Sequence, residues 1–99
     1  MRTNREYMIR EIAGEKILIP TGTASQKLNG MIRLTDTAAF IWEQVDTAEN
    51  LAEITARVCR EFDIDEETAA RDVHGFLYEL YIRDMVLDIP ELAGAAQDE

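Results

Sequence analysis

The sequence predicts an α+β domain of winged-helix-like architecture, in which a three-stranded antiparallel β-sheet is followed by three α-helices. Short extended segments occupy the first third of the chain, and segments with the apolar spacing of helices occupy most of the rest. No internal repeat, low-complexity tract or linker divides the chain, so a single domain is expected over residues 1–99. Strands and helices segregated along a chain in this order form a small sheet with the helices on one face.

The strands are predicted from three segments near the N-terminus. Residues 7–12 and 16–20 are extended in pattern and flank a short glycine-bearing turn at 13–15, which is typical of a β-hairpin. Residues 21–29 are polar and are expected to form a loop. Residues 31–34 follow a glycine and are predicted to form the third strand.

Two capped helices come next. Thr35 is placed as the N-cap of a helix that runs through about Val45. Asn50 is placed as the N-cap of the second helix, and Glu53 lies where its carboxylate could reach back to complete a capping box. Each helix has one apolar stripe, formed in the first by Ala38, Ile41, Trp42 and Val45 and in the second by Leu51, Ile54, Val58 and Phe62.

The third helix is predicted to begin after Asp65 and to run to about Asp84. Acidic residues fill its first turn, where the helix dipole favours negative charge. Residues 85–89 are then expected to form a short extended exit, and residues 90–99 a loose tail. The ordered part of the chain is therefore expected to span about 7–89.

The charge of the chain restricts its partners. There are 20 acidic residues against 10 basic ones, for a net charge of −10. Such a field repels nucleic-acid phosphates and anionic membranes and attracts basic peptides. No apolar run is long enough to cross a bilayer, and the N-terminus lacks the apolar stretch of a secretory signal. A cytoplasmic protein without nucleic-acid or membrane partners is expected.

Catalysis and metal binding find little support in the sequence. Cys59 is the only thiol and His74 the only imidazole, and nothing places the two side chains together. Cys59 continues the apolar stripe of the second helix, as a structural cysteine does. The acidic alternation that starts at Asp63 resembles the opening of an EF-hand loop, but Thr68 replaces its glycine and His74 its terminal glutamate. We expect no enzyme activity, cofactor or metal.

The most informative feature is a wide apolar arc on the third helix, broader than a stripe that only packs a core. If the strand at 31–34 lies at the sheet edge beside this helix, its unpaired backbone groups could receive a partner segment as a further strand. The arc comprises Ala69, Val73, Phe76, Leu77 and Leu80 and is extended by Ala70, His74 and Tyr81.

Two alternatives remain open. The last two helices could form the helix-turn-helix of a winged-helix DNA-binding transcriptional regulator, although residues 65–84 contain six acidic residues and only Arg71 and Arg83 as basic ones. The chain could instead be a structural dimerisation module, a homodimer that buries the aromatic arc.

The run Ile-Arg-Leu-Thr-Asp-Thr-Ala-Ala-Phe-Ile-Trp at 32–42 resembles the central signature of PqqD-like proteins. The order of patterned hydrophobic residues resembles this family over about 7–88. The sequence departs from the family at Thr35, where asparagine is common, and at Asp84, near which glycine is frequent. Threonine also caps helices and aspartate tolerates left-handed backbone, so neither change threatens the fold.

The resemblance implies a RiPP recognition element, a non-enzymatic domain that binds the leader segment of a ribosomally synthesised precursor peptide. Such domains present the peptide to a maturation enzyme, often a radical-SAM protein. In the family the leader adds as a strand to the third β-strand and packs against the third helix. The peptide-binding residues that this implies here are Met31, Ile32, Arg33, Leu34, Ala70, Val73, His74, Leu77 and Tyr81.

Overall fold

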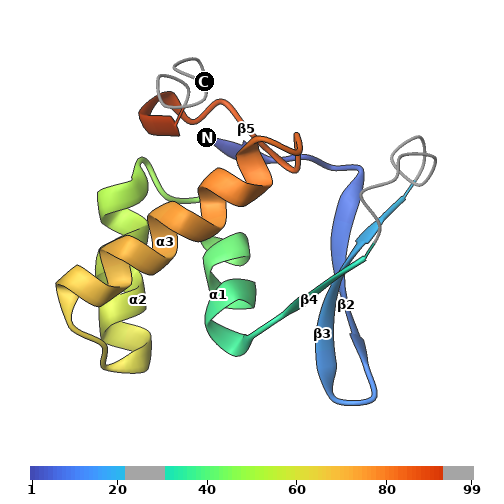
Figure 1. The fold of residues 1–99 in the computed structure, drawn as a ribbon, viewed down its shortest axis with the longest axis horizontal. Coiled ribbons are helices and arrows are strands. Elements are labelled where there is room, and N and C mark those ends of the chain that lie inside the picture. Colours follow the sequence, from blue (N-terminus) through green and yellow to red (C-terminus); the bar gives the residue numbers. More distant parts are fainter. Residues whose placement is uncertain (22–30, 93–99) are drawn as a thin grey trace.

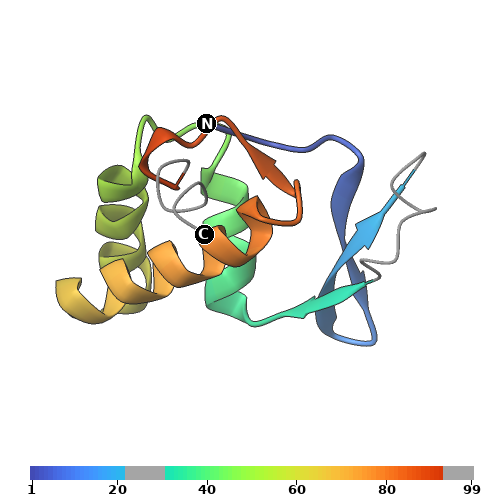
Figure 2. The same cartoon turned by 45° about the horizontal axis from the view of Figure 1, so that its top comes forward.

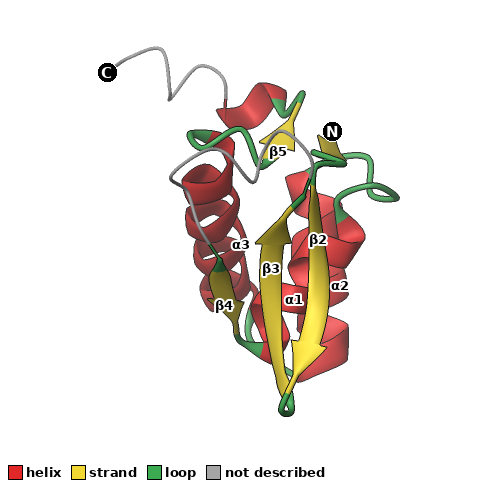
Figure 3. Cartoon of the chain, turned by 90° about the vertical axis from the view of Figure 1, so that its right-hand side faces the viewer, coloured by secondary structure: helices red, strands yellow, loops and turns green. Residues whose placement is uncertain are grey.

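A computed structural model of the chain, which describes residues 1–21 and 31–92, confirms the predicted α+β fold. Strands β2 (Tyr7–Ile12), β3 (Glu15–Pro20) and β4 (Ile32–Leu34) form an antiparallel sheet in the order β2-β3-β4 (Figure 1). Nearly all of the predicted 21–29 loop lies outside the described residues. The sheet stands to one side of the helices, and β4 lies between β3 and the last helix (Figure 3).

The hairpin turn is one residue shorter than predicted. Ile12 pairs with Glu15, so only Ala13 and Gly14 connect β2 to β3. Both have positive φ, 53° and 82°, as a type I′ turn requires. This turn twists in the same sense as the strands, which explains why a two-residue connection is sufficient here.

Three helices follow the sheet: α1 (Asp36–Gln44), α2 (Leu51–Phe62) and α3 (Glu66–Tyr81). Figure 2 shows α3 crossing in front of the other two. The third helix ends three residues earlier than predicted, because the chain turns at Asp84, where φ is 59°.

The predicted N-caps Thr35 and Asn50 are confirmed, and Asp65, after which the third helix was expected to begin, caps α3 in the same way. In each, a side-chain oxygen accepts a hydrogen bond from the backbone N–H three residues later. The Thr68 hydroxyl donates a further hydrogen bond of 2.8 Å to Asp65, and this bond, together with the backbone one, lowers the pKa of the Asp65 carboxyl. The capping box is only half formed, because Glu53 pairs with Arg57 one turn further on. The capping distances are 3.1 Å from Ala38 to Thr35, 2.8 Å from Glu53 to Asn50 and 3.1 Å from Thr68 to Asp65.

A second, two-stranded sheet joins the two ends of the described chain. Strand β1 (Arg2–Thr3) pairs antiparallel with β5 (Val86–Leu87), which lies within the predicted extended exit. Asp46 fastens β1 to the end of α1 by accepting hydrogen bonds from the N–H and the hydroxyl of Thr3, both at 2.8 Å. The sequence did not predict β1, because two residues are too few to show a strand period.

The ordered part of the chain also extends beyond the predicted start of the tail. Residues 90–92 are helical, and Leu92 is fully buried, as is Ile89 nearby. The Glu91 carboxylate accepts a hydrogen bond of 2.9 Å from the N–H of Leu51, at the first turn of α2. The part of the predicted tail beyond 92 lies outside the described residues.

The core lies between the inner face of the sheet and the three helices. The sheet contributes three buried side chains to this core, those of Tyr7, Leu18 and Leu34. None of the helices within 1–21 and 31–92 is long and apolar enough to span a membrane. The fully buried large side chains are Leu18, Ile41, Val45, Ile54, Val58, Val73, Leu77, Leu80, Met85, Val86, Ile89 and Leu92.

Candidate functional site

The candidate site begins with the open edge of β4. Within the three-stranded sheet, β4 pairs with β3 alone, so its second edge receives no strand from the described part of the chain. The Thr21 N–H donates a hydrogen bond of 2.6 Å to the Glu6 carbonyl, so these two residues form a hydrogen-bonded pair. Hydrogen-bonded and non-hydrogen-bonded pairs alternate along an antiparallel ladder, so this pair determines which residues of β3 face β2 and which face β4. By the same alternation Ile32 and Leu34 direct their backbone groups toward β3.

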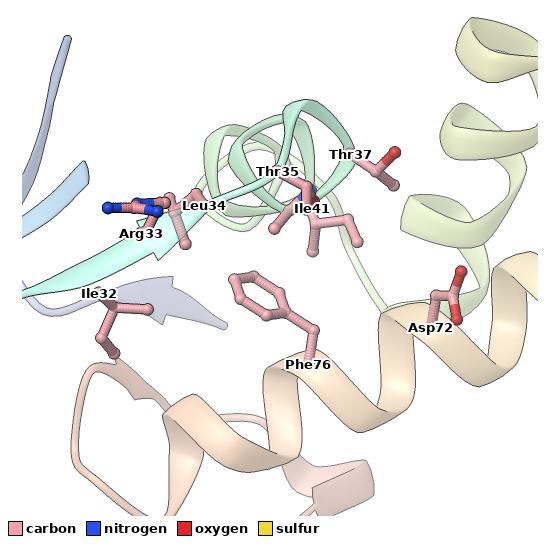
Figure 4. A pocket seen from close by; sticks show the side chains of 9 residues that line it. Ile32, Arg33, Leu34, Thr35, Thr37, Ile41, Asp72 and Phe76 are labelled. Atoms are coloured by element: carbon pink, nitrogen blue, oxygen red, sulfur yellow. The ribbon is translucent and has the colours of Figure 1, made fainter. Parts of the chain in front are cut away.

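The alternation leaves Arg33 as the residue that offers hydrogen bonds at the open edge. Its N–H and C=O point away from β3, while its side chain lies on the face of the sheet opposite to Ile32 and Leu34. Figure 4 shows the Arg33 guanidinium directed away from Phe76. A strand that pairs here would therefore be held through the backbone of Arg33.

A pocket of about 410 Å³ lies between this edge and α3. The Phe76 ring rises from α3 toward β4 and separates Ile32 from Ile41 (Figure 4). The lining is mostly apolar, which suits the side chain of a bound peptide better than a charged substrate. Its residues are Ile32, Arg33, Leu34, Thr35, Thr37, Ala38, Ile41, Asp72 and Phe76.

A second cavity of about 340 Å³ continues the first along α3. It is lined by Ile32, Phe76, Glu79, Leu80 and Arg83, so Ile32 and Phe76 border both cavities. Together the two cavities form a groove that follows β4 on one side and α3 on the other. We call it the β4–α3 groove and define it by Ile32, Leu34, Asp72, Phe76, Glu79 and Arg83.

The two ends of the β4–α3 groove differ in charge. Asp72, at one end, makes no hydrogen bond or ion pair with the described residues. At the other end the Arg83 guanidinium forms an ion pair of 2.7 Å with the Glu79 carboxylate, so the two opposite charges offset each other. The unpaired charge in the groove is therefore negative and lies at the Asp72 end.

The structure brings only part of the predicted site together. Ile32, Arg33 and Leu34 line the groove, and Met31, 67% exposed, directly precedes β4. The five predicted residues of α3 lie elsewhere. Val73 and Leu77 are fully buried, Ala70 borders a cavity beside α2, His74 is exposed and Tyr81 packs partly buried against the core.

The face of α3 that borders β4 is instead formed by Asp72, Phe76, Glu79 and Arg83. The apolar arc that the sequence predicts as the groove wall is divided between the two sides. Phe76 and Leu80 line the cavities, whereas Ala69, Val73 and Leu77 are fully buried in the core. The sequence contains a signal for the face that borders β4, since residues 72, 76, 79 and 83 follow the helical spacing. An aromatic residue between charged neighbours on such a row indicates a partly exposed surface.

The thiol and the imidazole considered in the sequence lie on different helices, α2 and α3. Cys59 is partly buried against the core, and His74 lies on the exposed surface of another helix. Across 1–21 and 31–92, no group of three or more histidine, cysteine, aspartate or glutamate side chains is arranged to hold a metal ion.

Comparison with solved structures shows the same fold in two proteins. One is TbiB1 in complex with the TbiA(beta) leader peptide, at 22% identity and a TM-score of 0.67, covering 87% of this chain and 94% of that one. The other is lasso peptide synthetase B1 complexed with the leader peptide, at 20% identity and a TM-score of 0.68, covering 88% and 96%. No curated protein matches the sequence.

A family-level match identifies the chain more directly. Residues 15–86 match the family described as Coenzyme PQQ synthesis protein D (PqqD). The match includes β3, β4, the three helices and both cavities of the β4–α3 groove. The chain therefore belongs to the PqqD family.

Proposed function

We propose that this chain is a RiPP recognition element that binds the leader segment of a ribosomally synthesised precursor peptide and presents it to a modifying enzyme. The observation that carries the proposal is the open edge of β4 beside the apolar β4–α3 groove. The two structural relatives support it, since both are described as complexes with a leader peptide.

The arrangement of the groove supports binding by strand addition. An incoming strand that pairs with the backbone of Arg33 extends the sheet by one strand. Successive side chains of this strand point to opposite faces of the sheet. The peptide residue that pairs with Arg33 points to the same face as the Arg33 side chain, so the peptide residues before and after it point into the groove and contact Phe76. Main-chain hydrogen bonds then supply affinity, and the apolar cavities select the side chains.

The chain itself is proposed to have no enzymatic activity, and the chemistry belongs to the partner. A radical-SAM enzyme is the partner that the family resemblance favours. Binding to DNA through α3 is disfavoured, because the first turn of that helix presents Glu66 and Glu67 to solvent, and phosphates would be repelled there. The residues proposed to contact the peptide are Ile32, Arg33, Leu34, Asp72 and Phe76.

Calorimetric titration with the leader of the cognate precursor tests the proposal. Phe76→Ala removes the ring shared by both cavities, and we expect the affinity to fall by about tenfold or more, as for a buried aromatic anchor. Ile82→Ala is the matched control, because Ile82 is 49% exposed and lies outside the groove. Circular dichroism verifies that both variants are folded. If wild type and Phe76→Ala bind the leader equally well, the peptide does not occupy this groove.

A further inference from the structure

The face of the sheet turned away from the helices has an unusual composition for a surface. Figure 3 looks onto this face, with the helices behind β2 and β3. The register places Met8 beside Ile19, and Ile17 between Arg10 and Arg33. We call this surface the outer face and define it by Met8, Arg10, Ile12, Glu15, Ile17, Ile19 and Arg33.

The outer face is apolar where a solvated sheet is usually polar. A sheet with one face on the core normally alternates apolar and polar residues, so that the second face is wetted. Here Met8 and Ile12 are 39% and 50% exposed, and Ile17 and Ile19 beside them are partly exposed. Contiguous apolar surface of this kind in a soluble domain marks an interaction site.

The charge of the outer face also opposes that of the whole chain. Arg10 has no ion pair or hydrogen bond within the described residues, and Arg33 meets Glu15 at 3.3 Å with both side chains more than half exposed. Because Arg33 is paired with Glu15, Arg10 carries the unpaired charge among the described residues of β2, β3 and β4 on this face, and this charge is positive, whereas the chain has a net charge of −10. A partner with carboxylates around an apolar patch would be complementary to it.

A second copy of the chain fits this face poorly. Packing two copies about a two-fold axis near Ile17 would bring Arg10 and Arg33 of one copy against the same residues of the other. Two chains of net charge −10 also repel each other at long range. A different protein with the opposite charge pattern would fit this face better.

We propose that the outer face docks the modifying enzyme, through an apolar patch bordered by aspartate or glutamate on that enzyme. The proposal rests on the proposed function. Arg33 connects the two surfaces, since its backbone lies at the edge that would pair with the peptide and its side chain lies on the outer face. An enzyme docked here would lie directly beside the bound peptide without competing for the groove.

Two variants on the outer face and one control test the proposal. Arg10→Glu reverses the unpaired charge, and Ile17→Glu places a charge at the centre of the apolar patch. Arg60→Glu makes the same charge change on α2, where Arg60 is also exposed and without an ion pair among the described residues. Each variant is assayed by biolayer interferometry against the modifying enzyme and by fluorescence anisotropy against the leader, both taken from genes adjacent to that of this chain.

The expected result separates the two surfaces. Arg10→Glu and Ile17→Glu should weaken binding to the enzyme by about tenfold or more while leader affinity stays within about twofold, and Arg60→Glu should leave both unchanged. Enzyme binding equal to wild type in both outer-face variants would overturn the proposal. So would a wild-type dimer in sedimentation that Ile17→Glu dissociates. If the chain binds the enzyme through this face but binds no leader, only the proposed function fails.

Discussion

Ala13 is the residue at which the local sequence fits the backbone least well. It has a φ of 53° in the type I′ turn, a conformation that disfavours alanine because its Cβ crowds the following carbonyl. Asparagine visits this region more readily, and Asn-Gly is the preferred pair for such turns. We therefore expect Ala13→Asn to raise the free energy of unfolding by about 0.5–1 kcal/mol, measured by urea denaturation.

Gly14 provides the matched control within the same turn. A Cβ added to Gly14 would meet nothing within 4 Å, so the cost of Gly14→Ala is conformational and not steric. With φ at 82°, this variant should be destabilised, opposite in sign to Ala13→Asn. If both substitutions shift stability in the same direction, the turn is not of type I′.

Capping residues were predictable one by one because the signal is local. Asn50 and Asp65 each accept from a backbone N–H only three residues away, so sequence spacing alone identifies them. The carboxylate of Glu53 was not predictable in the same way. This carboxylate has two partners within reach, the backbone N–H of the cap and the Arg57 guanidinium, and it pairs with the guanidinium because a charged donor forms the stronger hydrogen bond.

At the scale of elements, α3 shows where sequence reasoning fails. Apolarity marks the side of a helix that is most buried, and on α3 that side packs on the core through Val73 and Leu77. A binding groove needs residues that are partly exposed, such as Phe76. The sequence pattern therefore identified the helix that borders β4, but it did not separate the side that packs on the core from the side that faces β4, because the position of β4 relative to α3 is set by tertiary packing.

The short strand β4 gives the sharpest test of strand addition. In the free protein the amides of Ile32 and Leu34 bond to β3, whereas the Arg33 amide points to the open edge. We expect saturating leader peptide to slow hydrogen exchange at Arg33 by about tenfold or more while Ile32 and Leu34 change less, measured by NMR.

The hydrogen-exchange measurement reports whether the leader pairs with β4, whereas calorimetry reports only whether the leader binds. If calorimetry shows that the leader binds but exchange at Arg33 is unchanged, the peptide occupies the groove without joining the sheet. The Arg10 amide is an internal control, because the register places its backbone groups between β2 and β3, away from the open edge.

At the scale of the whole molecule, the fold class follows from the order of elements, while the pairing of β1 with β5 does not. Strands followed by helices required an α+β arrangement, and the observed β2-β3-β4 sheet agrees. The β1–β5 pairing joins residues more than 80 positions apart through two-residue strands. Nothing local in the sequence encodes such a contact, so it emerges only in three dimensions.

Leu92 tests whether the packing of residues 90–92 on the core contributes to stability. The side chain is fully buried although a loose tail was expected from residue 90 onward. Leu92→Ala should lower the free energy of unfolding by about 2–4 kcal/mol, through lost burial and the cavity left behind. Ile12→Ala is the control, since Ile12 is half exposed and its truncation should cost about 1 kcal/mol or less. Equal urea midpoints for Leu92→Ala and wild type would show that residues 90–92 do not pack on the core.

The net charge of −10 makes a last prediction about the peptide. A leader with lysine or arginine is attracted by the whole molecule and meets the unpaired Asp72 at one end of the groove. Because salt screens exposed charges beyond about 10 Å at 0.1 M, raising the salt concentration should weaken leader binding. Calorimetry at low and high salt measures this, and Asp72→Asn should reduce the salt dependence.

Asp63→Asn makes the same charge change at the C-cap of α2, outside the groove, and should have a smaller effect. Affinity independent of salt would mean that the apolar cavities alone hold the peptide, and that the acidic surface serves only solubility.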